Sequence, residues 1–185
     1  MKKIFDFKRI TNKLLYAPII LLPFLMYLLI YFVIRVFVLP LPGEFHIVLI
    51  SVPLLFLLFF VGAVVEETGY MGCAIGPLQD RFGALTASIL IGVSSAVWHF
   101  PSIIQQGHGF SWIAWGNSRN SCRQSFDCLI FNNTGKSLFA CILFHTMLNI
   151  GKPLFPRDEV HIPSVDCPDI YYSVIAVIAI IVVFL

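Results

Sequence analysis

The sequence predicts an all-α protein, a polytopic transmembrane helix bundle of about five or six spans. Hydrophobic residues fill 58% of the 185 positions and charged residues only 12%, whereas charged residues approach about a quarter of soluble domains. Mean hydropathy is +0.89. The apolar residues form separate runs that end at proline, glycine or charge, and a span needs roughly 20 residues. The chain therefore reads as a single membrane domain, residues 1–185, with the lipid bilayer as its main solvent.

The N-terminal segment, residues 1–13, is basic. Five cations precede the first apolar run: Lys2, Lys3, Lys8, Arg9 and Lys13. The positive-inside rule predicts a cytoplasmic N-terminus, in a multi-pass protein of the cell membrane. The run Leu14–Val38 is too long for the apolar region of a signal peptide, so we expect a retained anchor that stops at Pro40–Gly43. The net charge of +2 is too small to suggest a nucleic-acid partner.

The second apolar run begins near Ile47 and, in our interpretation, continues past its first charges. Charge and a possible C-terminal glycine next coincide at Asp80–Gly83. We therefore predict a helix to about Gln79, long enough to need tilt or a bend, and the positions that favour a bend are Gly69, Gly72, Gly76 and Pro77. A third span is expected from Ala84 to about Gln105, in which Pro101 is a tolerated kink or an early end.

The rest of the chain predicts less regular structure. No span fits within 107–133 without burying two arginines, because the stretch Gly116–Asp127 is polar. Ser137–Ile150 is apolar apart from His145 and Asn149. Ile170–Leu185 reads as a final, slightly short hydrophobic helix without charge.

Five polar residues inside apolar runs are the candidate catalytic residues: Glu66, Glu67, His99, His145 and Asn149. An ionisable group in a membrane helix costs on the order of 2 to 3 kcal/mol, so such groups are functional candidates by default. Adjacent residues on a helix point about 100° apart, so the two glutamates should have separate roles. Counted from the turn at Gly83, Glu67 and His99 have equal depth on an antiparallel pair. His145 and Asn149 share a face because they are four residues apart.

These residue types favour hydrolysis of an acyl or peptide bond. A carboxylate beside an imidazole can take a proton from water, and a second imidazole with a carboxamide can stabilise a developing oxyanion. Zinc held by two histidines and a glutamate is the competing account, although no His-Glu-x-x-His sequence occurs. The histidines could instead be interhelical hydrogen-bonding groups, and the glutamates could mark a helix end at the membrane interface. An ion or proton carrier would need a continuous polar path, and the sequence shows one polar layer.

At these positions the chain resembles the CAAX-processing and bacteriocin-processing membrane protease family, also called the Abi family. Its first motif, a Glu-Glu pair followed by an aromatic residue and a glycine, stands here as Glu66-Glu67-Thr68-Gly69-Tyr70-Met71-Gly72. The second, an aromatic residue shortly before a histidine, is Trp98-His99-Phe100-Pro101. The third, His-x-x-x-Asn, is Phe144-His145-Thr146-Met147-Leu148-Asn149. The resemblance covers residues 65–150, a protease-like core.

The resemblance implies an endopeptidase of the CAAX-processing type with a membrane-associated peptide or protein substrate. Glu66 would activate water, Glu67 and His99 would support it, and His145 with Asn149 would bind the oxyanion. We favour water activation with no obligatory cofactor, and zinc is the alternative. The sequence departs from the family at Met71, where many members have an arginine, and at Gly116–Asp127, where the family usually has another span. These departures leave open a locally frame-shifted reading, or a catalytically silent member that acts as a membrane scaffold or immunity protein.

Overall fold

The computed structural model describes residues 4–37, 51–105, 107 and 110–154, and within these ranges all regular structure is helical. The elements, in chain order, are η1 (Phe7–Arg9), η2 (Lys13–Leu15), α1 (Tyr16–Phe37), α2 (Val52–Gly69), η4 (Tyr70–Ala74), α3 (Ile75–Phe82), α4 (Ala84–Gln105), α5 (Phe110–Asn133) and α6 (Leu138–Leu154). The predicted all-α class is confirmed. The predicted stop at Pro40–Gly43 and the final helix at Ile170–Leu185 lie outside the described residues.

Three stretches are long and apolar enough to cross a membrane: Lys13–Val33, Val52–Phe82 and Ala84–Gln105. A shorter apolar helix covers Leu138–Gly151. Together they show a membrane protein with several candidate spans, as the composition predicted. The bounds of α4 agree with the predicted third span, and Pro101 lies inside the helix, where the sequence allowed it as a kink.

The second apolar run continues past the glutamates, as predicted, and it changes helical geometry at the predicted bend. α2 ends at Gly69, and η4 is a π-helical segment that connects it to α3. The hydrogen bonds of a π-helical segment span one residue more than those of an α-helix, which locally shifts the register of the side chains that follow. α3 ends at Phe82 and is capped by Gly83, whose φ of +79° suits glycine and whose N–H donates to the carbonyl of Gln79 at 2.9 Å.

The polar stretch Gly116–Asp127 lies within one continuous helix, α5, rather than in irregular structure. α5 packs against α4 in the most extensive contact between helices of the described residues. Small residues allow this approach: a Cβ at Gly92 of α4 would lie 2.4 Å from the Cα of Ser121. The buried polar residues of α5 are Asn120, Gln124 and Asp127. Burial against α4 therefore explains a helix that the sequence, taken alone, did not predict.

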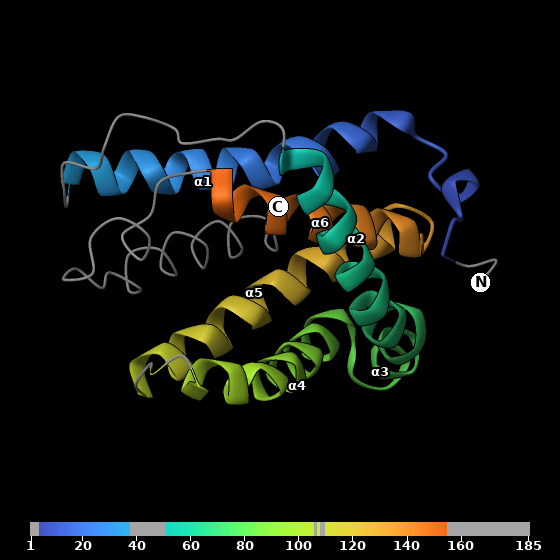
Figure 1. The fold of residues 1–185 in the computed structure, drawn as a ribbon. Helices are drawn as coiled ribbons and strands as arrows, with labels where there is room; N and C mark the ends of the chain where they lie inside the picture. Colours follow the sequence, from blue (N-terminus) through green and yellow to red (C-terminus); the bar gives the residue numbers. More distant parts are fainter. Residues whose placement is uncertain (1–3, 38–50, 106, 108–109, 155–185) are drawn as a thin grey trace.

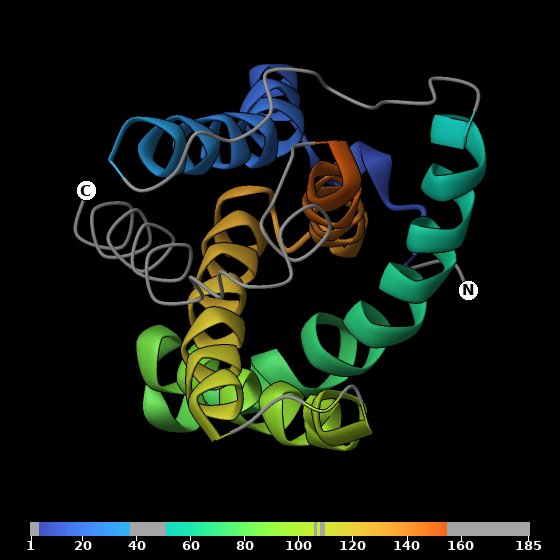
Figure 2. The ribbon, with the colours of Figure 1, turned by 60° about the vertical axis from the view of Figure 1, so that its left-hand side comes forward.

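Helix α6 lies at the centre of the bundle, between α1, α2 and α5 (Figure 2). The side chains of Cys141, Ile142, Phe144 and Thr146, which point in different directions around it, are all fully buried. Its first turn is held from the N-terminal segment, because Asp6 accepts hydrogen bonds from the Ser137 hydroxyl at 2.8 Å and from the backbone N–H of Phe139 at 3.3 Å.

The described N-terminal segment, the α3–α4 turn and the α5–α6 turn lie at one end of the bundle (Figure 1). Arg9 contributes to this arrangement by donating to the carbonyl of Lys136 at 3.3 Å, 127 residues away. The chain reverses at Gly83, where α3 meets α4, and α3 packs against α4.

Candidate active site

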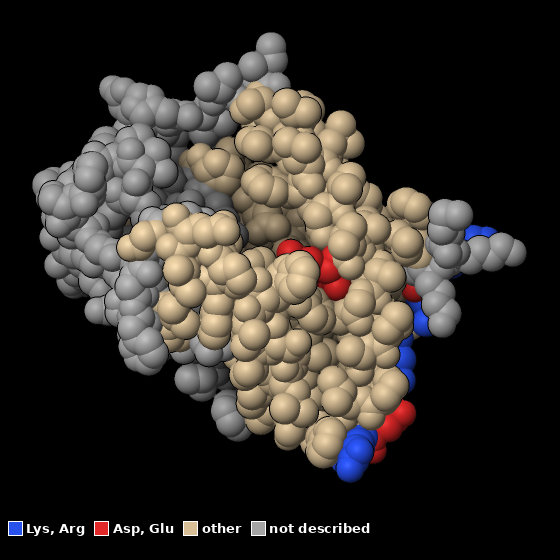
Figure 3. All heavy atoms as spheres, turned by 60° about the horizontal axis from the view of Figure 1, so that its bottom comes forward, with Lys and Arg blue, Asp and Glu red and all other residues tan. Residues whose placement is uncertain are grey.

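The two adjacent glutamates lie in the last turn of α2, directly before the π-helical segment, and they have different surroundings. The side chain of Glu67 is fully buried, whereas that of Glu66 is 28% exposed. This difference follows from their roughly 100° separation around the helix. On the face drawn in Figure 3, acidic atoms lie beside a hollow among uncharged atoms, and the other charged atoms in this view lie toward its edge. Glu66 is therefore the carboxylate of this pair that an outside molecule can reach.

The partner of Glu67 on α6 is His145. The Nδ1 atom of His145 lies 2.8 Å from Oε1 of Glu67, and the imidazole is buried with it. Asn149 is four residues after His145 and therefore lies one turn further along α6, where it is half-buried. These two elements, α2 and α6, pack directly against each other.

The guanidinium of Arg123, on α5, lies among these groups. Its Nη1 atom is 2.8 Å from Oε1 of Glu67, 3.2 Å from Oδ2 of Asp127 and 3.0 Å from Nδ1 of His145. Its Nη2 atom is 3.5 Å from Oε2 of Glu66. The side chain of Arg123 is 12% exposed and that of Asp127 is fully buried. One guanidinium thus contacts three carboxylates and an imidazole.

Counting donors assigns the proton on His145. Nη1 has two hydrogens and three neighbouring acceptor positions, so it cannot serve all three at once. If Nδ1 carries a proton, it donates to Glu67, and the two Nη1 hydrogens go to Glu67 and Asp127. The contacts of Glu67 and Asp127 are then all hydrogen bonds, and only the 3.0 Å contact between Nη1 and Nδ1 is not one. An unprotonated Nδ1 would instead face the Glu67 oxygen with two lone pairs opposed. We therefore assign the Nδ1–H form, which leaves Nε2 as the ring nitrogen available to another molecule.

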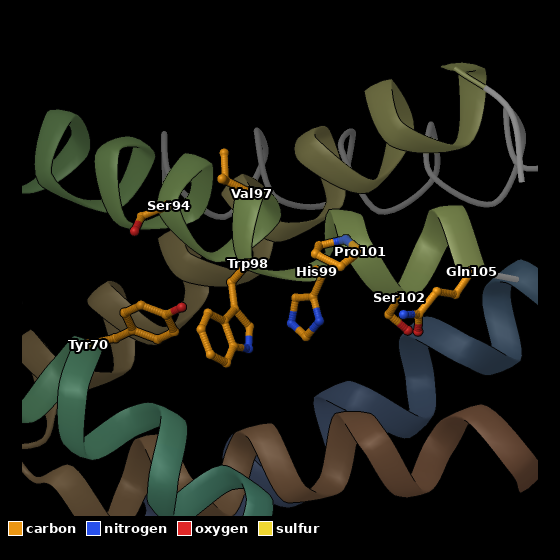
Figure 4. Close-up of a pocket in the computed structure, with 8 residues that line it drawn as sticks. All are labelled: Tyr70, Ser94, Val97, Trp98, His99, Pro101, Ser102 and Gln105. Atoms are coloured by element: carbon orange, nitrogen blue, oxygen red, sulfur yellow. The ribbon is translucent and has the colours of Figure 1, made fainter.

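His99 lies on α4, outside the group formed by Glu66, Glu67 and His145. It lines an open pocket of about 720 Å³, together with Tyr70, Trp98 and Ser102 among others. Figure 4 shows Trp98 and His99 pointing from α4 into this pocket, which Tyr70 reaches from the start of η4. The backbone N–H of Tyr70 bonds to the carbonyl of Glu66. The pocket and the glutamates are thus joined through consecutive turns of one chain segment.

A metal ion has one set of possible ligands among the described residues. One ligand atom each from Glu66, Glu67 and His145 lies within 4.8 Å of the others. This set has two carboxylates and one imidazole, unlike the two histidines and one glutamate that the sequence suggested. Two carboxylate oxygens and an imidazole nitrogen are suitable zinc ligands, but the contacts described above place a guanidinium against all three.

The sequence analysis missed Arg123 and Asp127, although both lie in the polar stretch that looked unlike a membrane helix. Their i, i+4 spacing was a usable signal, because it places the two side chains on one face of a helix. The sequence also indicated that a span here would bury two arginines. It gave no indication that one of them would meet the glutamates, because that contact depends on how α5 packs against α4.

Comparison with known proteins agrees with the resemblance. The family model "Type II CAAX prenyl endopeptidase Rce1-like" matches residues 48–151, which include all five predicted site residues and Arg123. "CAAX prenyl protease 2" of Methanococcus maripaludis is 32% identical over 114 residues, which cover 56% of this chain and 41% of that protein. The chain therefore spans less than half of that relative. Because the family model matches more than half of the chain, and its range includes the whole cluster around Arg123, this protein belongs to the Rce1-like type II CAAX prenyl endopeptidase family.

Proposed function

We propose that this protein is an intramembrane endopeptidase of the CAAX-processing type, which hydrolyses a peptide bond of a membrane-associated substrate by activating water. The observation that carries this proposal is the convergence of Glu66, Glu67 and His145 from two helices on one partly open site. Family membership supplies the substrate class, a peptide or protein that carries a prenylated C-terminal tail. We place the protein in the cell membrane with its N-terminus in the cytoplasm.

In the proposed reaction, Glu66 is the general base because it is the accessible carboxylate of the pair. It takes a proton from water while the water oxygen bonds to the scissile carbonyl carbon. A second proton on His145, at Nε2, makes the ring an imidazolium, and Glu67 and Asp127 together balance its charge and that of the neighbouring Arg123. This ring donates to the oxyanion together with the Asn149 amide. When the intermediate collapses, the C–N bond breaks and the leaving amine takes the proton from Glu66.

Glu67 has a supporting role in this scheme. Because it is fully buried and accepts from both Arg123 and His145, it holds the imidazole rather than the substrate. His99 is proposed to act from α4, in the pocket that Tyr70 and Trp98 also line. Glu67 bonds to His145 and Arg123, and we assign His99 to substrate positioning.

The second candidate function is a catalytically silent family member that acts as a membrane scaffold or immunity protein. The two departures from the family pattern, Met71 and the polar stretch Gly116–Asp127, are the features that suggested this function. Met71 is 1% exposed and lies in an apolar cluster with Ile75 and Leu138 among others. The polar stretch instead supplies the guanidinium that position 71 lacks. Both features are therefore compatible with a complete site.

The test is cleavage of a peptide with a prenylated C-terminal tail by the purified chain in liposomes, compared with the Glu66→Ala variant. We expect turnover by the wild type and a loss of at least about 100-fold in kcat for the variant, the scale on which a removed catalytic group is felt. Arg81→Ala is the control, because Arg81 is exposed at the end of α3 and its guanidinium lies over its neighbour Phe82.

Full activity of Glu66→Ala would refute the assignment of the general base. If the folded wild type cleaves neither prenylated nor unprenylated peptides, the result would favour a catalytically silent family member. A membrane phenotype unaffected by Glu66→Ala would point the same way.

A further inference from the structure

Three ligand atoms that can hold a divalent cation surround a position that is already next to a cationic side chain. Arg123 contacts Glu67 and His145 through Nη1, at 2.8 and 3.0 Å, and Glu66 through Nη2, at 3.5 Å. A zinc ion bound to the same atoms at about 2.0 to 2.2 Å would lie against the guanidinium. The two cations would repel each other in a site shielded from water.

We propose that Arg123 is an internal cation that takes the place of a divalent metal ion in this site and positions Glu67 and His145. Glu67 Oε1 accepts from Arg123 and His145, so both lone pairs of this oxygen are used, whereas Oε2 is buried without a hydrogen-bond partner among the described residues. Asp127, four residues further along α5, accepts from the same Nη1 atom and so helps to fix the orientation of the guanidinium. This assignment concerns the contents of the site and stands whether or not the chain cleaves peptides.

The geometry also explains why an arginine, rather than a lysine, suits this position. The planar guanidinium presents two nitrogens to different partners, Nη2 to Glu66 and Nη1 to the other groups. A lysine ammonium is a single point charge that cannot reach both sets of partners in a fixed orientation. Arg123→Lys should therefore preserve the charge of the site while losing the orientation of one glutamate.

The experiment uses Co²⁺ as a spectroscopic probe on the full chain in detergent micelles. The wild type is expected to show no Co²⁺ d–d absorption that depends on Glu67, because the guanidinium occupies the position. Arg123→Ala removes the cation and retains the three ligands, so it is expected to bind one equivalent of Co²⁺. The double variant Arg123→Ala/Glu67→Gln removes a ligand as well and should lose that absorption.

One result on the wild type alone would overturn the proposal. If the wild type binds one equivalent of Co²⁺ and the d–d bands disappear in Glu67→Gln, the site holds a metal and Arg123 does not replace it. This comparison needs no arginine variant, so it decides the matter even if Arg123→Ala fails to fold. A folded Arg123→Ala that binds no Co²⁺ would also contradict the proposal.

The positioning role has a separate readout, turnover of the prenylated peptide, and that part rests on the proposed function. Arg123→Ala is expected to lower kcat by about 10- to 100-fold with a smaller change in KM, as for other residues that orient a reacting group through a hydrogen bond. Added methylguanidinium should restore part of kcat in Arg123→Ala and none in Glu67→Gln. An unchanged kcat in Arg123→Ala would refute positioning, whereas a wild type without turnover would refute the proposed function and leave the Co²⁺ result standing.

Discussion

At the scale of single residues, neighbouring side chains in one helical turn have contrasting surroundings. Glu66 is partly exposed and lies 3.5 Å from Arg123. Glu67 is fully buried and bonds to two residues on two other helices. The expectation of separate roles for the adjacent glutamates came from helix geometry alone. The structure adds which of them faces outward and which holds the interior together.

This contrast predicts that the two glutamates differ in their effect on stability. Glu67→Ala removes the main partner of a buried arginine, and breaking such a pair costs about 3 to 5 kcal/mol. Glu66→Ala removes a longer and partly exposed contact, for which about 0 to 1 kcal/mol is expected. Reversible unfolding in mixed detergent micelles measures both. Equal losses of unfolding free energy in the two variants would contradict the assignment of Glu67 as the internal anchor.

At the scale of helices, the position of Arg123 depends on the close packing of α5 against α4. The α4 residues buried in this helix are mostly small: Ala87, Ser88, Gly92, Ser95 and Ala96. Ser88 and Ser125 add a hydrogen bond across the contact at 3.2 Å. Because the backbones approach so closely at Gly92, a side chain there would push α5 and its arginine away from α2.

We therefore predict that Gly92→Ala destabilises the protein by about 1 to 3 kcal/mol, the cost of overpacking a tight contact, and lowers peptide turnover. The control is Gly62→Ala in α2, where a Cβ would meet nothing within 4 Å. That variant should be neutral or slightly stabilising, since alanine favours a helix by up to about 1 kcal/mol. Thermal unfolding in detergent measures the first effect and the peptide assay the second. Equal stability of both variants would mean that the α4–α5 contact can relax.

Some helices of this bundle could be predicted from the sequence and others could not. The helix at Ala84–Gln105, the continuation through the glutamates and the stop at Gly83 were predictable, because apolar length, glycine and charge are local signals. α5 was not predictable from local signals, because two of its polar residues, Arg123 and Ser125, bond to partners far away in sequence. Arg123 and Glu67 are 56 residues apart. The candidate site was therefore predictable as a set of motif residues, but its central cation was not.

At the scale of the whole molecule, the two short turns and the described N-terminal segment define one end of the bundle (Figure 1). Arg9, Lys13, Arg81 and Lys136 are all exposed and belong to these segments. A gathering of exposed cations at one end is the pattern that the positive-inside rule associates with the cytoplasm. We propose this orientation for the bundle.

The proposed orientation predicts opposite labelling of two positions. Gln105 is exposed at the far end of α4, and Lys136 is exposed in the α5–α6 turn. In a variant whose native cysteines are alanine, we expect an impermeant maleimide to label Gln105→Cys in intact cells and Lys136→Cys only after lysis. The reverse pattern would invert the topology, and labelling of both positions in intact cells would contradict a bundle with these two turns on opposite sides.

The polar character of α5 affects how the protein enters the membrane during synthesis. Unlike α4, α5 is not among the helices that are apolar enough to cross a bilayer, and buried arginine and aspartate make insertion of an isolated helix unfavourable. Its best available partner is α4, which has just been synthesised and presents a complementary row of small residues. We therefore expect α4 and α5 to leave the translocon together as a helical hairpin, with α5 inserted by its neighbour rather than by its own hydrophobicity.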